Sequence, residues 1–225
     1  MNAWSGFGSA CGFVLGTTMV GCATYETAGL ANELTLLRQN LPSEMLWMND
    51  WKTEPWRRGH ATAKVNIDIV EYVRPPETIQ NWTEMLTMIV EWKMSKADSH
   101  AGGTTISEVP SPTAMADAVR VAAQNRCAEP VSFQILGENK SAYYPSTVFY
   151  LACGKFKESS PSVAEAQVQH VFQGKHAMHT VIRAKRAASL DKATLDAWTQ
   201  YIARFYVCDN KISGQECGAK KSFQF

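Results

Sequence analysis

The side chains that could do acid–base chemistry are scattered along the chain. Glu71, Glu84 and Glu91 could in principle supply paired carboxylates for a hydrolysis. Because they fall on alternating or edge positions of expected strands, we expect them to face solvent. The chain has no G-x-S-x-G elbow, P-loop, H-E-x-x-H motif or dinucleotide-binding glycine fingerprint. We therefore predict no catalytic residue, and a hydrolase would need a site assembled only in the fold.

Two histidines, His170 and His179, flank a turn that contains a glycine. If Gly174-Lys175 is a two-residue hairpin turn, the register places the two imidazoles opposite each other, and such a pair can bind a metal ion. His176 would lie on the other face, and no third ligand is evident. We therefore expect paired surface histidines, with no metal and no other cofactor.

The N-terminal segment has the composition of an export signal. Residues 1–21 contain no Asp, Glu, Lys or Arg, and the apolar run 10–16 is shorter than the roughly 20 residues that span a bilayer. A short apolar core followed by small residues is typical of a cleavable signal peptide. Met19-Val20-Gly21-Cys22 resembles the lipobox of bacterial lipoproteins. The resemblance implies acylation of Cys22 and, because Ala23 follows, a periplasm-facing position on the outer membrane.

Four cysteines remain beyond Cys22, an even number for an oxidising compartment. We favour the two local pairs, Cys127–Cys153 and Cys208–Cys217, out of three possible pairings. On the loop-entropy model these bonds would contribute about 3.5 and 2.7 kcal/mol. The alternative is four buried thiols in a cytosolic protein. A four-cysteine zinc site is disfavoured because the chain has no C-x-x-C pair.

Aromatic and basic clusters are the remaining candidate sites. Trp47, Trp51 and Trp56 can either cover the edge of the core or form a patch for a ligand or a membrane interface, since Trp suits half-wet sites. Arg183 and Lys185-Arg186 are most simply a solvated strand end, with a phospholipid headgroup contact as the alternative.

Hydrophobic patterning predicts the elements that carry these residues. A short helix is expected near 27–39, and a helix capped by Ser111 runs to about 126. A last helix is capped by Ser189 or Asp191. The expected strands cover 63–73, 83–93, 131–136, 146–153, 165–173 and 176–184, with a turn at 137–140.

Length and charge set the domain organisation. The chain has 225 residues and a net charge of +1, which argues against nucleic-acid binding because that normally needs a basic excess. We expect a signal peptide over 1–21, a lipid anchor and tether over 22–55, a globular domain over 56–208 and a loose tail over 209–225, pinned only at Cys217.

The expected order β-β-α-β-β-β-β-α predicts an α+β domain in which two main helices cover an antiparallel sheet of about six strands. This order resembles the Mog/PsbP-like fold, whose members are accessory binding modules of envelopes and lumens. The segments 71–73, 81–85 and 150–153 also resemble uncharacterised proteobacterial envelope proteins. The resemblances imply a non-catalytic binding module with a protein partner. The alternatives are a carrier of a small molecule or lipid, with the tryptophans lining its pocket, and the hydrolase.

Overall fold

The computed structural model describes residues 44–48, 54–64, 67–92, 110–141, 143–157 and 163–217. The predicted signal peptide, the helix near 27–39, Cys22 and Trp51 lie outside these residues.

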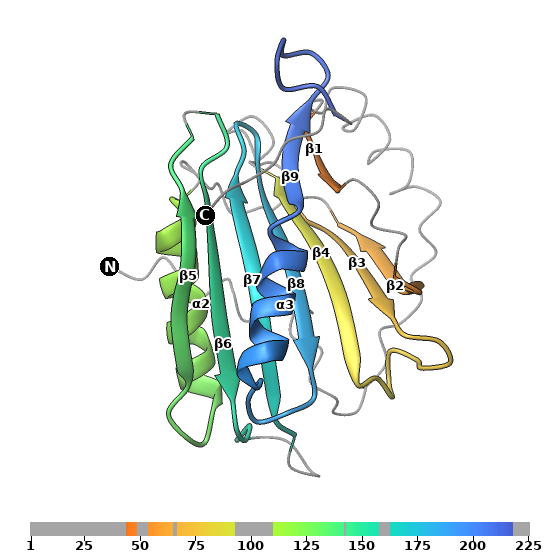
Figure 1. Ribbon diagram of the computed structural model, residues 1–225, viewed down its shortest axis with the longest axis vertical. Helices are drawn as coiled ribbons and strands as arrows, with labels where there is room; N and C mark the ends of the chain where they lie inside the picture. The colour runs from red at the N-terminus through yellow and green to blue at the C-terminus, as the bar shows by residue number, and fades with distance from the viewer. Residues whose placement is uncertain are drawn as a thin grey trace.

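A seven-stranded antiparallel sheet forms the body of the molecule, in the spatial order β2-β3-β4-β8-β7-β6-β5 (Figure 1). Its strands are β2 (Arg57–Ala63), β3 (Ile67–Val73), β4 (Glu84–Trp92), β5 (Ser132–Asn139), β6 (Ser146–Cys153), β7 (Glu165–Gln173) and β8 (Ala177–Lys185). Most neighbours follow each other in sequence, but β4 pairs with β8, so the chain leaves the sheet after β4 and returns at its far edge.

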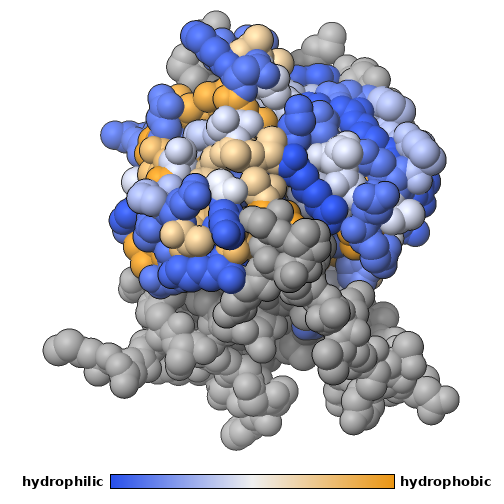
Figure 2. Space-filling view, turned by 90° about the horizontal axis from the view of Figure 1, so that it is seen from below, coloured by the Kyte–Doolittle hydropathy of each residue, from blue (hydrophilic) through white to orange (hydrophobic). Residues whose placement is uncertain are grey.

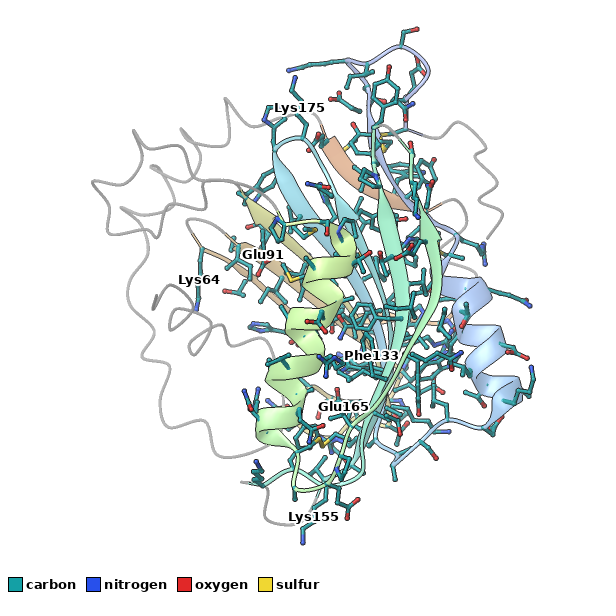
Figure 3. All side chains as sticks on the ribbon, turned by 90° about the vertical axis from the view of Figure 1, so that its left-hand side faces the viewer. Lys64, Glu91, Phe133, Lys155, Glu165 and Lys175 are labelled. Carbon is teal, nitrogen blue, oxygen red and sulfur yellow. A yellow bond between two sulfur atoms is a disulfide. The ribbon has the colours of Figure 1, made fainter. Side chains whose placement is uncertain are left out.

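Two helices cover opposite faces of this sheet (Figures 1 and 3). Helix α2 (Pro112–Arg126) packs on β6 and β7, and its cap Ser111 accepts a hydrogen bond from the Ala114 N–H. Helix α3 (Lys192–Ile202) packs on β7 and β8. Asp191, one of the two predicted caps, accepts from the Thr194 N–H at 2.8 Å. Side-chain oxygens satisfy helix N-termini in this way.

Two short strands form a separate antiparallel ribbon over the α3 face, β1 (Glu44–Met48) and β9 (Phe205–Asp209). Met48, Phe205 and Val207 point toward the sheet and join the core cluster that contains Phe172 and Trp198. The segment predicted to be a tether therefore contains, at its end, a strand that belongs to the fold.

The core lies on both sides of the central strands. Val148 and Val181 pack under α3, while Phe149 and Val171 pack under α2. Every residue of β6 is buried. This explains its continuous apolar sequence, because a strand covered on both faces has no solvated side.

The predicted elements appear in the predicted order, but the fold class needs correction. All six predicted strands and both predicted helices of the domain are present among the described residues. Three strands were missed: β1, β2 and β9. With nine strands and two helices in the described part, the domain is mainly β rather than a balanced α+β domain.

Two local predictions were wrong. The hairpin between β7 and β8 turns at Lys175-His176, since Gly174 N–H donates to the Ala177 carbonyl at 2.8 Å. Strand β5 does not end at Leu136: it continues to Asn139 through a register shift between Ile135 and Gly137. A glycine inside a strand commonly marks such a bulge.

Both predicted disulfides are present. Cys127, which follows α2, bonds to Cys153 at the end of β6, with their Cα atoms 5.8 Å apart. Cys208 in β9 bonds to Cys217, with a Cα separation of 5.0 Å. The second bond holds residues 210–217 against the ribbon, so this part of the predicted tail is fastened at both ends.

Within the described parts of the chain, neither helix has the length and apolarity needed to cross a membrane.

Candidate functional site

Charged and aromatic side chains meet on the α3 face of the sheet, where β4 begins and β8 ends. This arginine–tryptophan cluster consists of Glu54, Trp56, Arg74, Glu84, Arg183, Trp198 and Tyr201. Glu54 and Trp56 precede β2, Arg74 follows β3, and Trp198 and Tyr201 come from α3. The antiparallel register brings Glu84 and Arg183 to this face because it pairs Glu84 with Lys185 and Leu86 with Arg183.

Two carboxylates are shared between two guanidinium groups in this cluster. Arg183 Nη1 donates to Glu54 Oε1 at 3.1 Å, and Arg183 Nη2 donates to Glu84 Oε2 at 3.2 Å. Arg74 Nη2 donates to Glu84 Oε2 at 3.2 Å and also pairs with Glu54. The Arg183 side chain is 8% exposed, whereas the other three are about a quarter exposed. Planar guanidinium groups suit such shared pairs better than ammonium groups do.

Aromatic rings hold the same two arginines in place. The guanidinium carbon of Arg74 lies 4.0 Å from the centroid of a Trp56 ring, and that of Arg183 lies 4.7 Å from both Trp198 and Tyr201. Trp56 Nε1 donates to Tyr201 Oη at 3.1 Å. Stacking of this kind stabilises a partly desolvated cation. Burial raises the pKa of Tyr201, so its phenol is neutral and can accept that hydrogen bond.

The cluster corrects the prediction that Arg183 belongs to a solvated strand end. Arg183 is buried and points toward α3, because alternate residues of β8 face the two sides of the sheet. Lys185 and Arg186 are half-buried. The Arg186 guanidinium carbon lies 4.8 Å from a Trp82 ring centroid.

Beside the cluster, the α3 face of β3 and β4 carries half-buried apolar side chains. We call this surface the open face and define it by Val70, Tyr72, Met88 and Val90. Tyr72 and Met88 also touch the core. Helix α3 packs mainly on β7 and β8. In the view from the lower end, hydrophilic residues predominate on the side of β2 and β3, while hydrophobic residues gather toward β5 (Figure 2).

His170 is a core residue and not a surface histidine. It is fully buried, its Nε2 lies 3.0 Å from Ser146 Oγ, and its Nδ1 lies 3.1 Å from the Ile202 carbonyl oxygen. Its ring stacks on Phe172 with centroids 3.8 Å apart. Burial lowers the pKa of His170 to about 3, so the ring is neutral. The buried ring thus links the carbonyl of Ile202, the last residue of α3, to Ser146 at the start of β6.

His179 does not face His170, which corrects the predicted pair. Strands β7 and β8 pair His170 with Val181 and Phe172 with His179, because the turn lies one residue later than predicted. His179 is fully buried, with its Nε2 4.0 Å from Glu44 Oε2, too far for a hydrogen bond. No group of three metal-ligating side chains occurs in the part of the chain that the structure describes.

Glu44 is a buried carboxylate that sequence reasoning missed. Its Oε1 accepts from the Lys175 N–H at 2.7 Å, and its Oε2 accepts from the His176 N–H at 3.1 Å. Burial alone would raise the pKa of Glu44, but His179 and these two N–H groups outweigh it and lower the pKa below 4.5. The ionised side chain therefore ties β1 to the β7–β8 turn.

The three carboxylates considered for hydrolysis do not come together. Glu84 lies on the α3 face, in the arginine–tryptophan cluster, whereas Glu71 and Glu91 lie on the opposite face. Glu71 opposes Thr87, four residues from Glu91 along β4, which separates the two carboxylates by about 13 Å along the strand. Glu71 is 4% exposed, so its predicted solvent-facing position was wrong. Burial raises the pKa values of both Glu71 and Glu91.

The predicted tryptophan patch is divided. Trp47 lies on β1 opposite Tyr206 and is 40% exposed. Trp56 belongs to the arginine–tryptophan cluster, where Arg74 covers its ring. The spacing of the tryptophans identified Trp56 as a candidate from the sequence. Glu54 and Arg74 belong to no sequence motif and were not identified.

A scan of protein-family models matched none to this chain, and a search of curated proteins found no match.

Proposed function

We propose that the chain is a lipid-anchored protein of the bacterial cell envelope that acts as a non-catalytic binding or accessory module. The observation that carries this proposal is the pairing of Cys127 with Cys153 and of Cys208 with Cys217. Structural disulfides persist in oxidising compartments such as the periplasm. Together with the lipobox-like Met19–Cys22, they support export and an acyl anchor on Cys22 in the outer membrane.

The proposed partner is another protein of the envelope, and its proposed contact is the open face. Tyr72 and Met88 contribute apolar surface there, and the arginine–tryptophan cluster lies directly beside it. Aromatic and arginine side chains are enriched in the centres of protein interfaces. The order of elements predicted from the sequence resembles the Mog/PsbP-like fold, a family of accessory binding modules, and this resemblance favours the same class of function.

Site-specific photo-crosslinking in growing bacteria tests the partner contact. A photoreactive amino acid replaces Tyr72 on the open face and, as the matched control, Val121 on the outer side of α2, which is 44% exposed. We expect one discrete envelope-protein adduct from position 72 and none from position 121. Equal adducts from both positions, or none from position 72, would refute the assignment of the open face.

A further inference from the structure

The two edges of the seven-stranded sheet differ in how they are protected from other chains. β2 and β5 are its outermost strands, and each pairs with a neighbouring strand of the sheet on one side only. β2 carries Arg57, Arg58 and His60, and its ladder with β3 shifts register between Arg58 and His60. Charged side chains and bulges of this kind keep an edge strand from pairing with another chain.

β5 lacks this protection over most of its length. Residues 130–137 contain no Asp, Glu, Lys or Arg. The register shift comes only between Ile135 and Gly137, so 132–135 form a regular ladder with β6, and Ile135 is 38% exposed. Figure 3 looks onto this edge, and no strand of the described chain pairs with its outer side. The N–H and C=O groups that alternate residues direct outward can therefore bind a further extended strand.

Helix α2 runs beside this edge, antiparallel to β5. Thr113 Oγ1, near the start of the helix, donates to Glu138 Oε1 at 2.9 Å. Near the end of the helix, Gln124 Oε1 accepts from the Val131 N–H at 3.1 Å. Residues three or four apart share one side of a helix. The row of helix residues with this spacing from Thr113 to Gln124 therefore lies on the side of the β5 edge.

Two opposite charges, Asp117 and Arg120, belong to this row. Arg120 Nη2 lies 2.7 Å from Asp117 Oδ1, and the arginine and aspartate side chains are 40% and 63% exposed. Because α2 is antiparallel to β5, Asp117 lies nearer to the level of Glu138 and Arg120 nearer to that of Val131. A two-fold rotation about the middle of β5 exchanges these levels, so Asp117 of one copy comes close to the level of Arg120 of a second copy.

The apolar side chains of β5 are self-complementary under the same rotation. Phe133 and Ile135 point to the α2 side of the sheet, since the β6 residues opposite them pack under that helix. In an antiparallel pairing centred on Gln134, Phe133 of each copy opposes Ile135 of the other. Aromatic and β-branched residues form favourable cross-strand pairs. No like charges oppose each other within the paired segment, because 130–137 are uncharged.

We infer that two copies of this chain form a symmetric dimer by antiparallel pairing of their β5 strands. The two seven-stranded sheets then join into one continuous sheet, with both copies of α2 on the same face of it. The inference does not rest on the proposed function, because it uses neither Cys22 nor the open face. The open face belongs to β3 and β4, on the other side of the sheet from the β5 edge, so the dimer leaves it uncovered.

Sedimentation of the full chain carrying Cys22→Ser tests this inference, because no acyl chain then contributes to association. We expect a reversible dimer, with slower amide exchange at 132–135 above its dissociation constant than below it. Ile135→Lys is compared with Val121→Lys on the outer side of α2, a residue of similar exposure, 44%. Because a two-fold axis brings the two added charges close together, we expect Ile135→Lys to weaken dimerisation by at least about ten-fold. Val121→Lys should leave the affinity unchanged.

Charge variants on α2 test the two-fold arrangement separately. Asp117→Arg and Arg120→Asp each place like charges on both sides of the joined edge, so each variant alone should dimerise more weakly than the unmodified chain. An equimolar mixture of the two should recover association, and such a recovery cannot come from a change in the folding of either chain.

A chain that stays monomeric at every concentration would overturn the inference. A dimer that Ile135→Lys leaves intact, or that Ile135→Lys and Val121→Lys weaken equally, would also overturn it, because association would then use another surface. A mixture of the two charge variants that fails to recover association would contradict the two-fold pairing. These outcomes do not bear on the acylation of Cys22, which is absent from every sample.

Discussion

Three buried or nearly buried polar side chains each connect parts of the fold that are distant in sequence. His170 bridges a serine and a helix carbonyl, Glu44 fastens β1 to a turn, and Arg183 is locked between carboxylates and aromatic rings. Each of these groups has a charge or a polar atom that burial would penalise if it lacked a partner. Each of the three has such a partner, so the structure assigns these side chains to packing.

Arg183 is the residue on which the arginine–tryptophan cluster depends most. Because it is nearly buried and shared between Glu54 and Glu84, Arg183→Met leaves both carboxylates with Arg74 alone. We expect a loss of about 2 kcal/mol in the free energy of unfolding, between the values for exposed and buried pairs. Urea denaturation measures this difference.

The control for Arg183 is Lys192→Met, which removes the exposed Lys192–Asp196 pair, whose lysine side chain is 87% exposed. We expect that change to stay within about 0.5 kcal/mol. If both variants lost the same free energy of unfolding, the cluster would stabilise the fold no more than an exposed ion pair does.

Glu165 makes stability depend on pH. Burial raises the pKa of this carboxyl to about 8, although Arg186 and Arg126 partly oppose the shift. The folded state therefore binds a proton that the unfolded state has released above pH 4.5, so stability falls as the pH rises from 4.5 to 8. The slope from one such group reaches at most about 1.4 kcal/mol per pH unit.

Glu165→Gln removes the pH-dependent loss of stability, because the amide side chain does not titrate. We expect the variant to gain stability over the wild type progressively between pH 4.5 and pH 8, and to show no gain below pH 4.5. Chemical denaturation at a series of pH values measures the difference. A difference that stays constant across this range would show that Glu165 keeps an ordinary pKa in the folded protein.

At the scale of the elements, the ribbon of β1 and β9 depends on the turn between β7 and β8. Gly174 leaves room there: a Cβ atom at this position would lie 2.6 Å from Glu44 Oε2 and 2.7 Å from the Ala177 carbonyl oxygen. The contact with the Ala177 carbonyl cannot be relieved without moving the turn, and the Glu44 carboxylate could move away only by giving up its hydrogen bonds to the Lys175 and His176 N–H groups. The glycine is thus required by close packing.

Gly174→Ala is expected to lower the free energy of unfolding by about 1–3 kcal/mol, as overpacking does. It should also speed amide exchange in β1 and β9. Gly154→Ala is the matched control, because its Cβ would meet only the exposed Glu129 side chain, at 2.8 Å, which can rotate away. Unfolding measurements and hydrogen–deuterium exchange compare the two, and equal effects would argue against the proposed coupling of ribbon and turn.

Periodicity predicted the elements that bury a continuous face and missed those that do not. β6 and α3 were evident because burial imposes an apolar pattern on their residues. β2 is an exposed edge strand of Arg, Gly and His residues, and β1 and β9 are only five residues long, so neither pattern nor length identified them. The hairpin register was wrong because its turn uses Lys175-His176 and leaves Gly174 in the ladder.

The candidate site could be predicted only in part for a similar reason. Trp56 could be predicted as a candidate from its residue type, but the cluster around it joins positions as far apart in sequence as Glu54 and Tyr201. Such contacts depend on β4 pairing with β8, a connection across the sheet that local patterns do not encode. The disulfides were predictable because both close short loops, with separations of 26 and 9 residues.

At the scale of the whole molecule, two surfaces of the described fold bear on the proposed function. The open face beside the arginine–tryptophan cluster is proposed for a protein partner. The outer side of α2 serves as the comparison surface in the crosslinking experiment.

Intact-mass spectrometry of the native protein from membrane and soluble fractions tests the central claim most directly. We predict a membrane-bound product that begins at Cys22, carries acyl mass on that residue, and has lost two hydrogens for each of the two disulfides. A soluble cytosolic product that retains residues 1–21, with Cys127, Cys153, Cys208 and Cys217 all reduced, would contradict it.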